Sequence, residues 1–231
     1  MLLIIAAYLI GSIPFGFLIG KIRGIDIREH GSKNIGATNT GRVLGKKWGF
    51  LCFILDVAKG FAPTFFGGLW MGCLDPHWQS ETLTIPAPTQ QFLWIGVGIA
   101  AILGHMFPLY LKLRGGKGVA TAFGVMMGIY PFLTWPVFGA LLVWIIVVRI
   151  FRMISLASIL AAFSLPLWLL ISRIPRDADI KSTHNLITES QKVWPFFIIT
   201  IALALLILLR HRANISRILK GTEPTISKKK K

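Results

Sequence analysis

The stretch "VATAFGVMMGIYPFLTWPVFGALLVWIIVV", residues 119–148, decides the fold, because its thirty largely apolar residues are interrupted at "YPFLTWP". The whole stretch is too long for one membrane crossing, yet each half, at about 22 Å, is short for a crossing of the hydrocarbon core. The flanking charges decide between one crossing and two. "KLRGGKG" (112–118) contributes three basic residues before it, and Arg149 and Arg152 follow it, so both flanks are expected in the cytoplasm. We therefore predict that this stretch crosses outward and returns as a short helical hairpin.

The rest of the chain has the composition of an integral membrane protein. Of its 231 residues, 54% are hydrophobic and 15% are charged, and the mean hydropathy is +0.67. Five further apolar stretches are long enough to span a membrane as helices. We therefore expect an all-α polytopic membrane protein with seven transmembrane helices, in a single domain over residues 1–231. The predicted spans are 2–19, 48–71, 91–111, 119–130, 132–148, 153–171 and 193–209.

The distribution of Lys and Arg between the connections sets the expected orientation. Residues 20–47 contain seven basic side chains and residues 72–90 contain none, which places the first connection in the cytoplasm and the second outside. The N-terminus is then outside, and the C-terminus, with four terminal lysines at the lipid surface, is cytoplasmic. The connection 172–192, with four basic residues, is a partial exception. Topology and anionic lipid account for most of the net charge of +16, so no nucleic-acid partner is expected.

Four polar runs lie at the predicted cytoplasmic helix ends: "HGSKNIGATNTGR" (30–42), "GHMFPLYLKLRGGKGVAT" (104–121), "RMISLASI" (152–159) and "RHRANISRILKGTE" (210–223). In "GGKGVAT", glycines let backbone N–H groups approach an anion, Lys117 adds a positive charge, and a helix begins directly afterwards. Each loop alone is equally consistent with a tight solvated turn, but their convergence on one membrane face favours a phosphate site. The first run offers the corresponding groups in Ser32, Asn34, Thr38, Asn39 and Arg42.

Two histidines lie within these runs. His211 and Asn214 are three residues apart, so a continuing helix would present both on one side. For His105, a hydrogen bond to the backbone at the membrane interface is as good an interpretation as direct chemistry. Neither histidine is accompanied by a cluster of His or carboxylate ligands, so no metal site is expected.

Asp56 and Lys59 are ionisable residues inside a predicted span, three residues apart and hence on one helix face. Charges inside a membrane are costly and are usually paired or functional. We expect the two to form a mutual pair that braces the loops, with substrate contact or an ion path as alternatives.

Together with "LDVAKG" (55–60), the four runs resemble the bacterial glycerol-3-phosphate acyltransferases of the PlsY family, which use acyl phosphate as donor. The resemblance extends over nearly the whole chain and implies a seven-helix enzyme of the bacterial plasma membrane with its active site facing the cytoplasm. One departure is "GSKN" at 31–34, where the family often has "GSGN". By resemblance, the catalytic residues are Ser32, Arg42, Lys117, His211 and Asn214. The same runs supply the expected substrate-binding residues Gly31, Asn34, Gly36, Thr38, Asn39, His105, Gly115, Gly116, Gly118 and Ser155.

The implied reaction transfers an acyl group to the 1-hydroxyl of glycerol 3-phosphate and gives lysophosphatidic acid and phosphate, the first step of phospholipid synthesis. Acyl phosphate is already activated, so no cofactor is expected, and the candidate partners are the two substrates, the bilayer and the soluble enzyme that makes the donor. Lys117 and Arg42 would neutralise developing negative charge. Ser32, His211 and Asn214 would position the substrates.

Two questions stay open at this point. The base that takes the hydroxyl proton is either His211 or a phosphate oxygen of the donor, and we favour the phosphate oxygen. The alternative function is a transporter or exchanger of organic phosphates, a class that typically has inverted repeats and helices broken at the membrane midplane.

Overall fold

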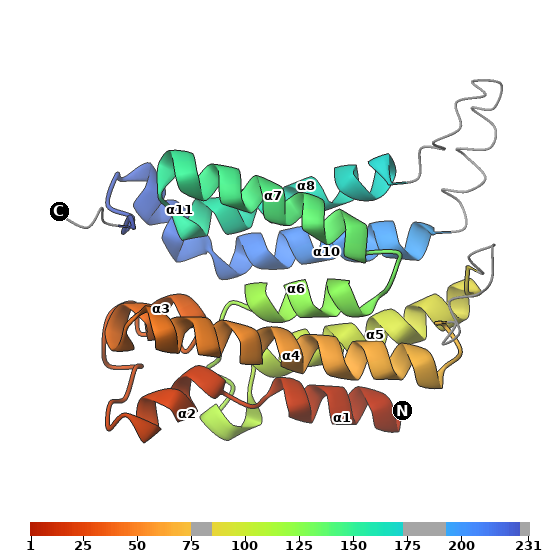
Figure 1. Ribbon diagram of the computed structural model, residues 1–231, viewed down its shortest axis with the longest axis horizontal. Helices are drawn as coiled ribbons and strands as arrows, with labels where there is room; N and C mark the ends of the chain where they lie inside the picture. The colour runs from red at the N-terminus through yellow and green to blue at the C-terminus, as the bar shows by residue number, and fades with distance from the viewer. Residues whose placement is uncertain (75–84, 173–192, 227–231) are drawn as a thin grey trace. The chain divides into compact units, whose positions relative to one another are not determined.

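The computed structural model describes residues 1–74, 85–172 and 193–226, and every regular element in these ranges is a helix (Figure 1). Parts of both predicted external connections and the terminal lysines lie outside the described residues. The helices in chain order are α1 (Leu2–Gly11), α2 (Phe15–Ile22), α3 (Ala37–Leu44), α4 (Lys46–Trp70), α5 (Pro88–Met106), the short 3₁₀ helix η1 (Leu109–Leu111), α6 (Val119–Gly128), α7 (Thr134–Phe151), α8 (Ile154–Ile171), α10 (Trp194–Arg210) and α11 (Arg212–Leu219).

The predicted spans all coincide with helices over most of their length. The pair α10 and α11, bent by 63°, is one candidate crossing, and α6, with 10 residues and a length of about 15 Å, is shorter than the others. The all-helical membrane fold is therefore confirmed, with five to six helical stretches long and apolar enough to cross a membrane within the described ranges. Besides the bent pair, these are Leu2–Ile22, Lys46–Trp70, Pro88–Leu111, Thr134–Phe151 and Ile154–Ile171.

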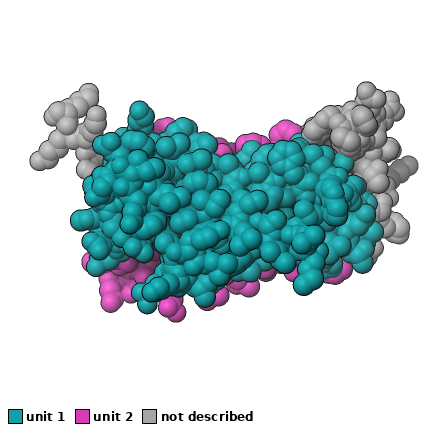
Figure 2. All heavy atoms as spheres, turned by 90° about the horizontal axis from the view of Figure 1, so that it is seen from below, with its two compact units in different colours: residues 1–130 teal, residues 131–231 magenta. Residues whose placement is uncertain are grey.

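The proline-containing break within residues 119–148 is confirmed. Helix α6 ends at Gly128 and α7 begins at Thr134, with Pro131 between them, because proline has no N–H to donate to a preceding helical turn. The break also coincides with the boundary between two compact units, residues 1–130 and residues 131–231, which Figure 2 colours separately.

Helix α4 is the central helix of the first unit. It packs against α1, α3, α5 and α6, while in the second unit α8 packs against α7, α10 and α11. Glycines bring α4 and α6 together: a Cβ on Gly124 would collide with the carbonyl of Val57, and one on Gly60 with the carbonyl of Thr121. Close packing of this kind is what associates helices in lipid, which is as apolar as their side chains. The helix that carries the intramembrane charges is thereby fixed within its unit.

The prediction of a single continuous helix over 2–19 is wrong. The chain forms α1 and α2 with a break between them, because the ring of Pro14 disfavours helical backbone at the preceding Ile13. The two halves still make one stretch of 21 residues that is long enough to span a membrane. The break leaves the carbonyl of Ile13 outside the helical pattern, and Lys59 Nζ donates a hydrogen bond to it at 2.7 Å. A local irregularity in one helix therefore supplies an acceptor for a cation on another.

Candidate active site

Asn39, near the start of α3, holds the preceding loop in place. Its side chain is 1% exposed, and its Oδ1 accepts a hydrogen bond from the Ser32 N–H at 2.7 Å. Its Nδ2 donates to the carbonyls of Ile27 and His30 at 2.9 and 3.1 Å. These bonds use both amide hydrogens and one oxygen lone pair. The geometry of Asn39 therefore favours a positioning role over the substrate contact expected from the sequence.

The turn before α3 depends on backbone conformations that suit glycine. Gly31 has a φ of +60°, and a Cβ there would collide with Oδ1 of Asn39. Asn34 closes the turn, since its Oδ1 accepts the N–H of Gly36 at 2.8 Å. Lys33 has a φ of +58°, a left-handed conformation that costs an L-residue roughly 1–2 kcal/mol. The departure "GSKN" thus places a lysine on backbone that glycine adopts more readily.

Apart from Gly31, which has no side chain, Ser32, Thr38 and Arg42 are the predicted residues of this loop that are exposed. Among the residues that the structure describes, none of their side chains takes part in a hydrogen bond or an ion pair. The loop therefore exposes two hydroxyls and a guanidinium on its surface, while the buried side chain of Asn39 holds the backbone beneath them.

Arg28, in the same connection, behaves differently from Arg42. Its guanidinium pairs with Asp26 at 2.6 Å and lies over the ring of Phe17, 4.4 Å from the ring centroid. The hydrogen bond from Arg28 lowers the pKa of Asp26 to about 2. The guanidinium of Arg28 is thus occupied by contacts within its own connection, whereas that of Arg42 is exposed.

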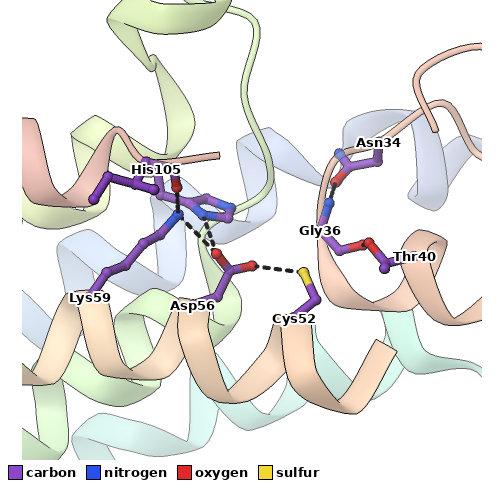
Figure 3. A network of polar contacts seen from close by, with 8 residues as sticks. Asn34, Gly36, Thr40, Cys52, Asp56, Lys59 and His105 are labelled. Atoms are coloured by element: carbon purple, nitrogen blue, oxygen red, sulfur yellow. Dashed lines mark hydrogen bonds and ion pairs between the residues drawn. The ribbon is translucent and has the colours of Figure 1, made fainter. Parts of the chain in front are cut away.

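A buried carboxylate in α4 collects three side chains (Figure 3). Lys59 Nζ lies 2.8 Å from Oδ1 of Asp56, and both side chains are 2% exposed, which confirms the predicted pair. His105 Nδ1 lies 3.5 Å from the same oxygen. The Cys52 thiol is directed at Oδ2, with its sulfur 3.6 Å away. The carboxylate therefore joins residues of α4 to the end of α5.

The glycines that follow are attached to that end of α5. The Gly115 N–H donates to the Met106 carbonyl and the Gly116 N–H to the His105 carbonyl, both at 3.1 Å. We expected these two N–H groups to face an anion, and that expectation needs correction because both already bond to backbone carbonyls. Their tight attachment fixes the start of the segment that carries Lys117.

Lys117 lies directly before the N-terminus of α6. The following Gly118 has a φ of +83° and is the residue from which the helix starts. The first N–H groups of a helix have no acceptor within it and favour anions such as phosphate. Lys117 is half-buried beside this N-terminus, so its ammonium and the first turn of α6 are the groups of this segment that suit a phosphate.

Glu223 organises a second cluster, within the second unit. Its Oε1 accepts hydrogen bonds from Ser155 Oγ and Asn214 Nδ2, both at 2.6 Å, and its Oε2 accepts from Arg217 Nε at 2.8 Å. Burial would raise the pKa of Glu223, but the hydrogen bonds from these three side chains outweigh it and hold the pKa below its usual value. The carboxylate thereby brings together Ser155 and Asn214, two of the predicted site residues.

The helix does not continue straight through His211. Helix α10 ends at Arg210 and α11 begins at Arg212, with a bend of 63° between them. Helix α10 is almost entirely apolar, whereas α11 is polar and amphipathic, so the two suit different surroundings. Asn214 and Arg217 still share a face of α11, where both contact Glu223.

The ring of His211 is buried where the helix bends. Its side chain is 2% exposed, and its Nδ1 lies 2.8 Å from the carbonyl oxygen of Ile207. A carbonyl only accepts hydrogen bonds, so Nδ1 carries the hydrogen and Nε2 carries the lone pair of the neutral ring.

Three of these groups were not identified from the sequence: Glu223, the Cys52 thiol and the Ile13 carbonyl. Glu223 does leave a signal, because it is the only acidic residue after Glu189 in a strongly basic tail. Cys52 lies four residues before Asp56 and so shares its helix face. The signal for Ile13 is the proline that follows it.

Replacing Glu223 by Gln tests the second cluster. The amide keeps an acceptor oxygen but loses the charge that holds Arg217, so we expect unfolding to become easier by about 1–3 kcal/mol at neutral pH. The pKa of Glu223 is lower in the folded chain than its usual 4.5, so its contribution is present above that pH and is lost as the pH falls through the folded value. Thermal unfolding in detergent from about pH 3 to about pH 8 should show that E223Q lacks this acid-dependent loss.

The matched control for E223Q is Glu29→Gln, which changes an exposed acid. If both variants showed the same stability and the same acid dependence as the unmodified chain, the structural role of Glu223 would be contradicted.

Comparison with known proteins identifies the family. The sequence model of the family described as glycerol-3-phosphate acyltransferase matches residues 1–221. A glycerol-3-phosphate acyltransferase of Staphylococcus aureus (strain Newman) is 37% identical over 227 residues, covering 98% of this chain and 97% of its own. One from Desulforamulus reducens is 38% identical over 231 residues, covering 100% of this chain and 96% of its own.

Two solved structures have the same fold. Both are crystal structures of PlsY, an integral membrane glycerol 3-phosphate acyltransferase, and each covers 98% of this chain and 94% of its own. The glycerol 3-phosphate form has a TM-score of 0.76 and 36% identity, and the lysophosphatidic acid form has a TM-score of 0.75 and 35% identity. The agreement in sequence, length and fold shows that this chain belongs to the glycerol-3-phosphate acyltransferase family of integral membrane enzymes.

Proposed function

We propose that this enzyme transfers an acyl group from acyl phosphate to the 1-hydroxyl of glycerol 3-phosphate, releasing lysophosphatidic acid and phosphate. Family membership supports the reaction class, and the related crystal structures are of glycerol 3-phosphate and lysophosphatidic acid forms. One observation carries the proposal: the side chains of Ser32, Thr38 and Arg42 are exposed on a loop whose backbone is held by the buried Asn39. A transporter has no support from the family or from these contacts.

Acyl phosphate suits this chain as donor for a chemical reason. It is a mixed anhydride whose leaving group is phosphate, and the loops offer a guanidinium and helix N-termini, which are good phosphate ligands. The sequence has no His-x4-Asp pair of the kind used by acyl-CoA-dependent acyltransferases. Activation is therefore built into the substrate, and the protein contributes charge stabilisation and orientation.

Arg42 and Lys117 stabilise charge in this proposal. As the glycerol hydroxyl oxygen bonds to the acyl carbon, negative charge develops on the carbonyl oxygen. When the bond from the acyl carbon to the bridging oxygen breaks, that charge moves to the departing phosphate. Fixed cations and N–H dipoles aimed at these oxygens lower the barrier. Ser32 and Thr38 add hydroxyl groups that can orient the phosphates.

The hydroxyl proton goes to a phosphate oxygen of the donor, so the reaction is assisted by its own substrate. His211 and Asn214 then orient the acceptor. The ring of His211 is held in one orientation because its Nδ1 is engaged by the Ile207 carbonyl. Asn214 is held by Glu223, which sets the direction of its amide.

The membrane arrangement in this proposal has seven crossings. Helix α6 is too short to span the membrane by itself, and in this proposal it crosses together with its flanking residues. The N-terminus is outside and the C-terminus is cytoplasmic. The membrane is the bacterial inner membrane, and the active site faces the cytoplasm, where a soluble enzyme supplies acyl phosphate. The support is the concentration of basic residues in 20–47 and 112–118 against their absence in 72–90.

Purified protein in detergent is given glycerol 3-phosphate together with either acyl phosphate or acyl-CoA. It should form lysophosphatidic acid with acyl phosphate as donor but not with acyl-CoA. In the same assay, Arg42→Ala should lose roughly 100-fold in kcat/KM, and Arg42→Lys should recover part of it, because an ammonium lacks the two-pronged guanidinium fork. Lys46→Ala, which removes another exposed cation, is the matched control and should keep near-normal activity. If neither acyl phosphate nor acyl-CoA gave lysophosphatidic acid, the proposed reaction would be refuted.

His211→Ala distinguishes the two candidate bases. If the donor phosphate takes the proton, the variant should bind glycerol 3-phosphate more weakly, with a KM raised roughly 10-fold, while kcat keeps its pH dependence. Rate measurements at saturating substrate across neutral pH provide the comparison. Loss of a titrating limb near neutrality in the variant would instead identify His211 as the base.

Labelling of introduced cysteines checks the orientation. In intact cells, a membrane-impermeant maleimide should label Thr89→Cys, at the exposed start of α5, and should label Lys46→Cys only after the cells are opened. The native Cys52 and Cys73 are buried, so background labelling should be low. The reverse labelling pattern would invert the proposed topology.

A further inference from the structure

We propose that His105 is a positioning residue, whose imidazole transmits the fixed position of the buried Asp56–Lys59 pair to the glycine segment that carries Lys117. The inference rests on the proposed function, because it assumes that Lys117 stabilises phosphate charge. It differs from the direct substrate contact that the sequence suggested for His105.

The first half of this connection is electrostatic. The His105 side chain is 4% exposed, and its Nδ1 lies 3.5 Å from the Oδ1 of Asp56 that also pairs with Lys59. Lys59 is anchored in turn by the carbonyl of Ile13 at 2.7 Å. A carboxylate in an apolar interior retains its donors strongly, because an unpaired charge there is costly. One edge of the imidazole is therefore fixed by α4 and by the break between α1 and α2.

The second half of the connection is steric. A Cβ on Gly116 would meet three atoms of the His105 ring before any other group, and it would collide with Nε2. The backbone is joined at the same place, since the Gly116 N–H donates to the His105 carbonyl at 3.1 Å. The other edge of the imidazole thus rests directly on the glycine that precedes Lys117.

The burial of the ring fits a positioning role. With one edge at the Asp56 carboxylate and the other against Gly116, the imidazole fills the space between a fixed charge and a glycine backbone. Without the ring, the segment has room to move toward α4. Displacement of a catalytic group by about 1 Å can reduce the rate roughly 100-fold. The effect of losing the ring should therefore reach the reaction through Lys117.

A double-mutant cycle between His105 and Gly116 tests the steric connection. Gly116→Ala alone should lower kcat/KM for glycerol 3-phosphate roughly 10-fold or more, because its methyl group collides with the ring and displaces the lysine. His105→Ala alone should give a loss of similar size. In the His105→Ala background, Gly116→Ala should cause little further loss, since the three nearest atoms to its methyl group are gone. Losses that simply multiply would overturn the proposal.

A second variant addresses the risk that His105→Ala does not fold. His105→Asn keeps a polar amide on the side of Asp56 but lacks the part of the ring that rests on Gly116. It should fold, show a loss of kcat/KM, and tolerate Gly116→Ala better than the unmodified chain does. Equal sensitivity to Gly116→Ala in both backgrounds would again overturn the proposal.

Thermal unfolding of each variant separates positioning from general stability. Thr64→Val, which removes a buried hydroxyl two turns further along α4 from Asp56, is the control and should lower the unfolding temperature without changing KM. Non-additivity seen in unfolding temperatures but absent from kcat/KM would make His105 purely structural. If the unmodified chain made no product, the proposed function would fail, while the unfolding temperatures would still report the contact between the ring and Gly116.

Discussion

The ion pair between Asp56 and Lys59 is the constraint on which the first unit depends. Each charge alone inside an apolar helix would cost roughly 2.5–3.5 kcal/mol, so the surroundings have to satisfy both. The carboxylate does so with a lysine, a histidine and a thiol, and the ammonium uses the Ile13 carbonyl released by the break at Pro14. Four segments are thereby tied to one point: the break between α1 and α2, helix α4, the end of α5 and the glycine segment after it.

The polar residues of the first loop divide into two groups with different tasks. Asn34 and Asn39 bond to backbone atoms and set the course of the chain. Ser32, Thr38 and Arg42 are exposed above it. This division follows from the chemistry of the side chains. A side-chain amide has enough donors and acceptors to bond to several segments of backbone at once. A guanidinium on a helix surface can instead extend toward an anion. In this loop, the side chains that contact phosphate in our proposal are not those whose hydrogen bonds shape the backbone.

The sequence predicts the membrane class, the span positions and the break at "YPFLTWP", because hydropathy and proline act locally. It did not predict the break at Pro14, since an apolar run with one proline near a glycine also reads as a single helix. The roles of Asn39, Gly116 and Glu223 depend on contacts with chain segments that loop back, and no local pattern reports such contacts. The glycines of "GGKG" show this most clearly: glycine content indicated a phosphate loop, but two of the N–H groups bond to α5.

Buried acids in a protein that handles phosphates call for an explanation, because a carboxylate repels a phosphate dianion. Asp56 and Glu223 are satisfied in the same way in separate units. Lys59 and His105 lie beside the carboxylate of Asp56, Arg217 lies beside that of Glu223, and the two acidic side chains are 2% and 6% exposed. Such a carboxylate acts on a phosphate only weakly, because its charge is cancelled at short range. It acts strongly on its donors, which it holds in single orientations without competing for an exposed cation such as Arg42. The buried acids thus hold the neighbouring side chains in place, and an exposed cation such as Arg42 remains available to the phosphates of the substrates.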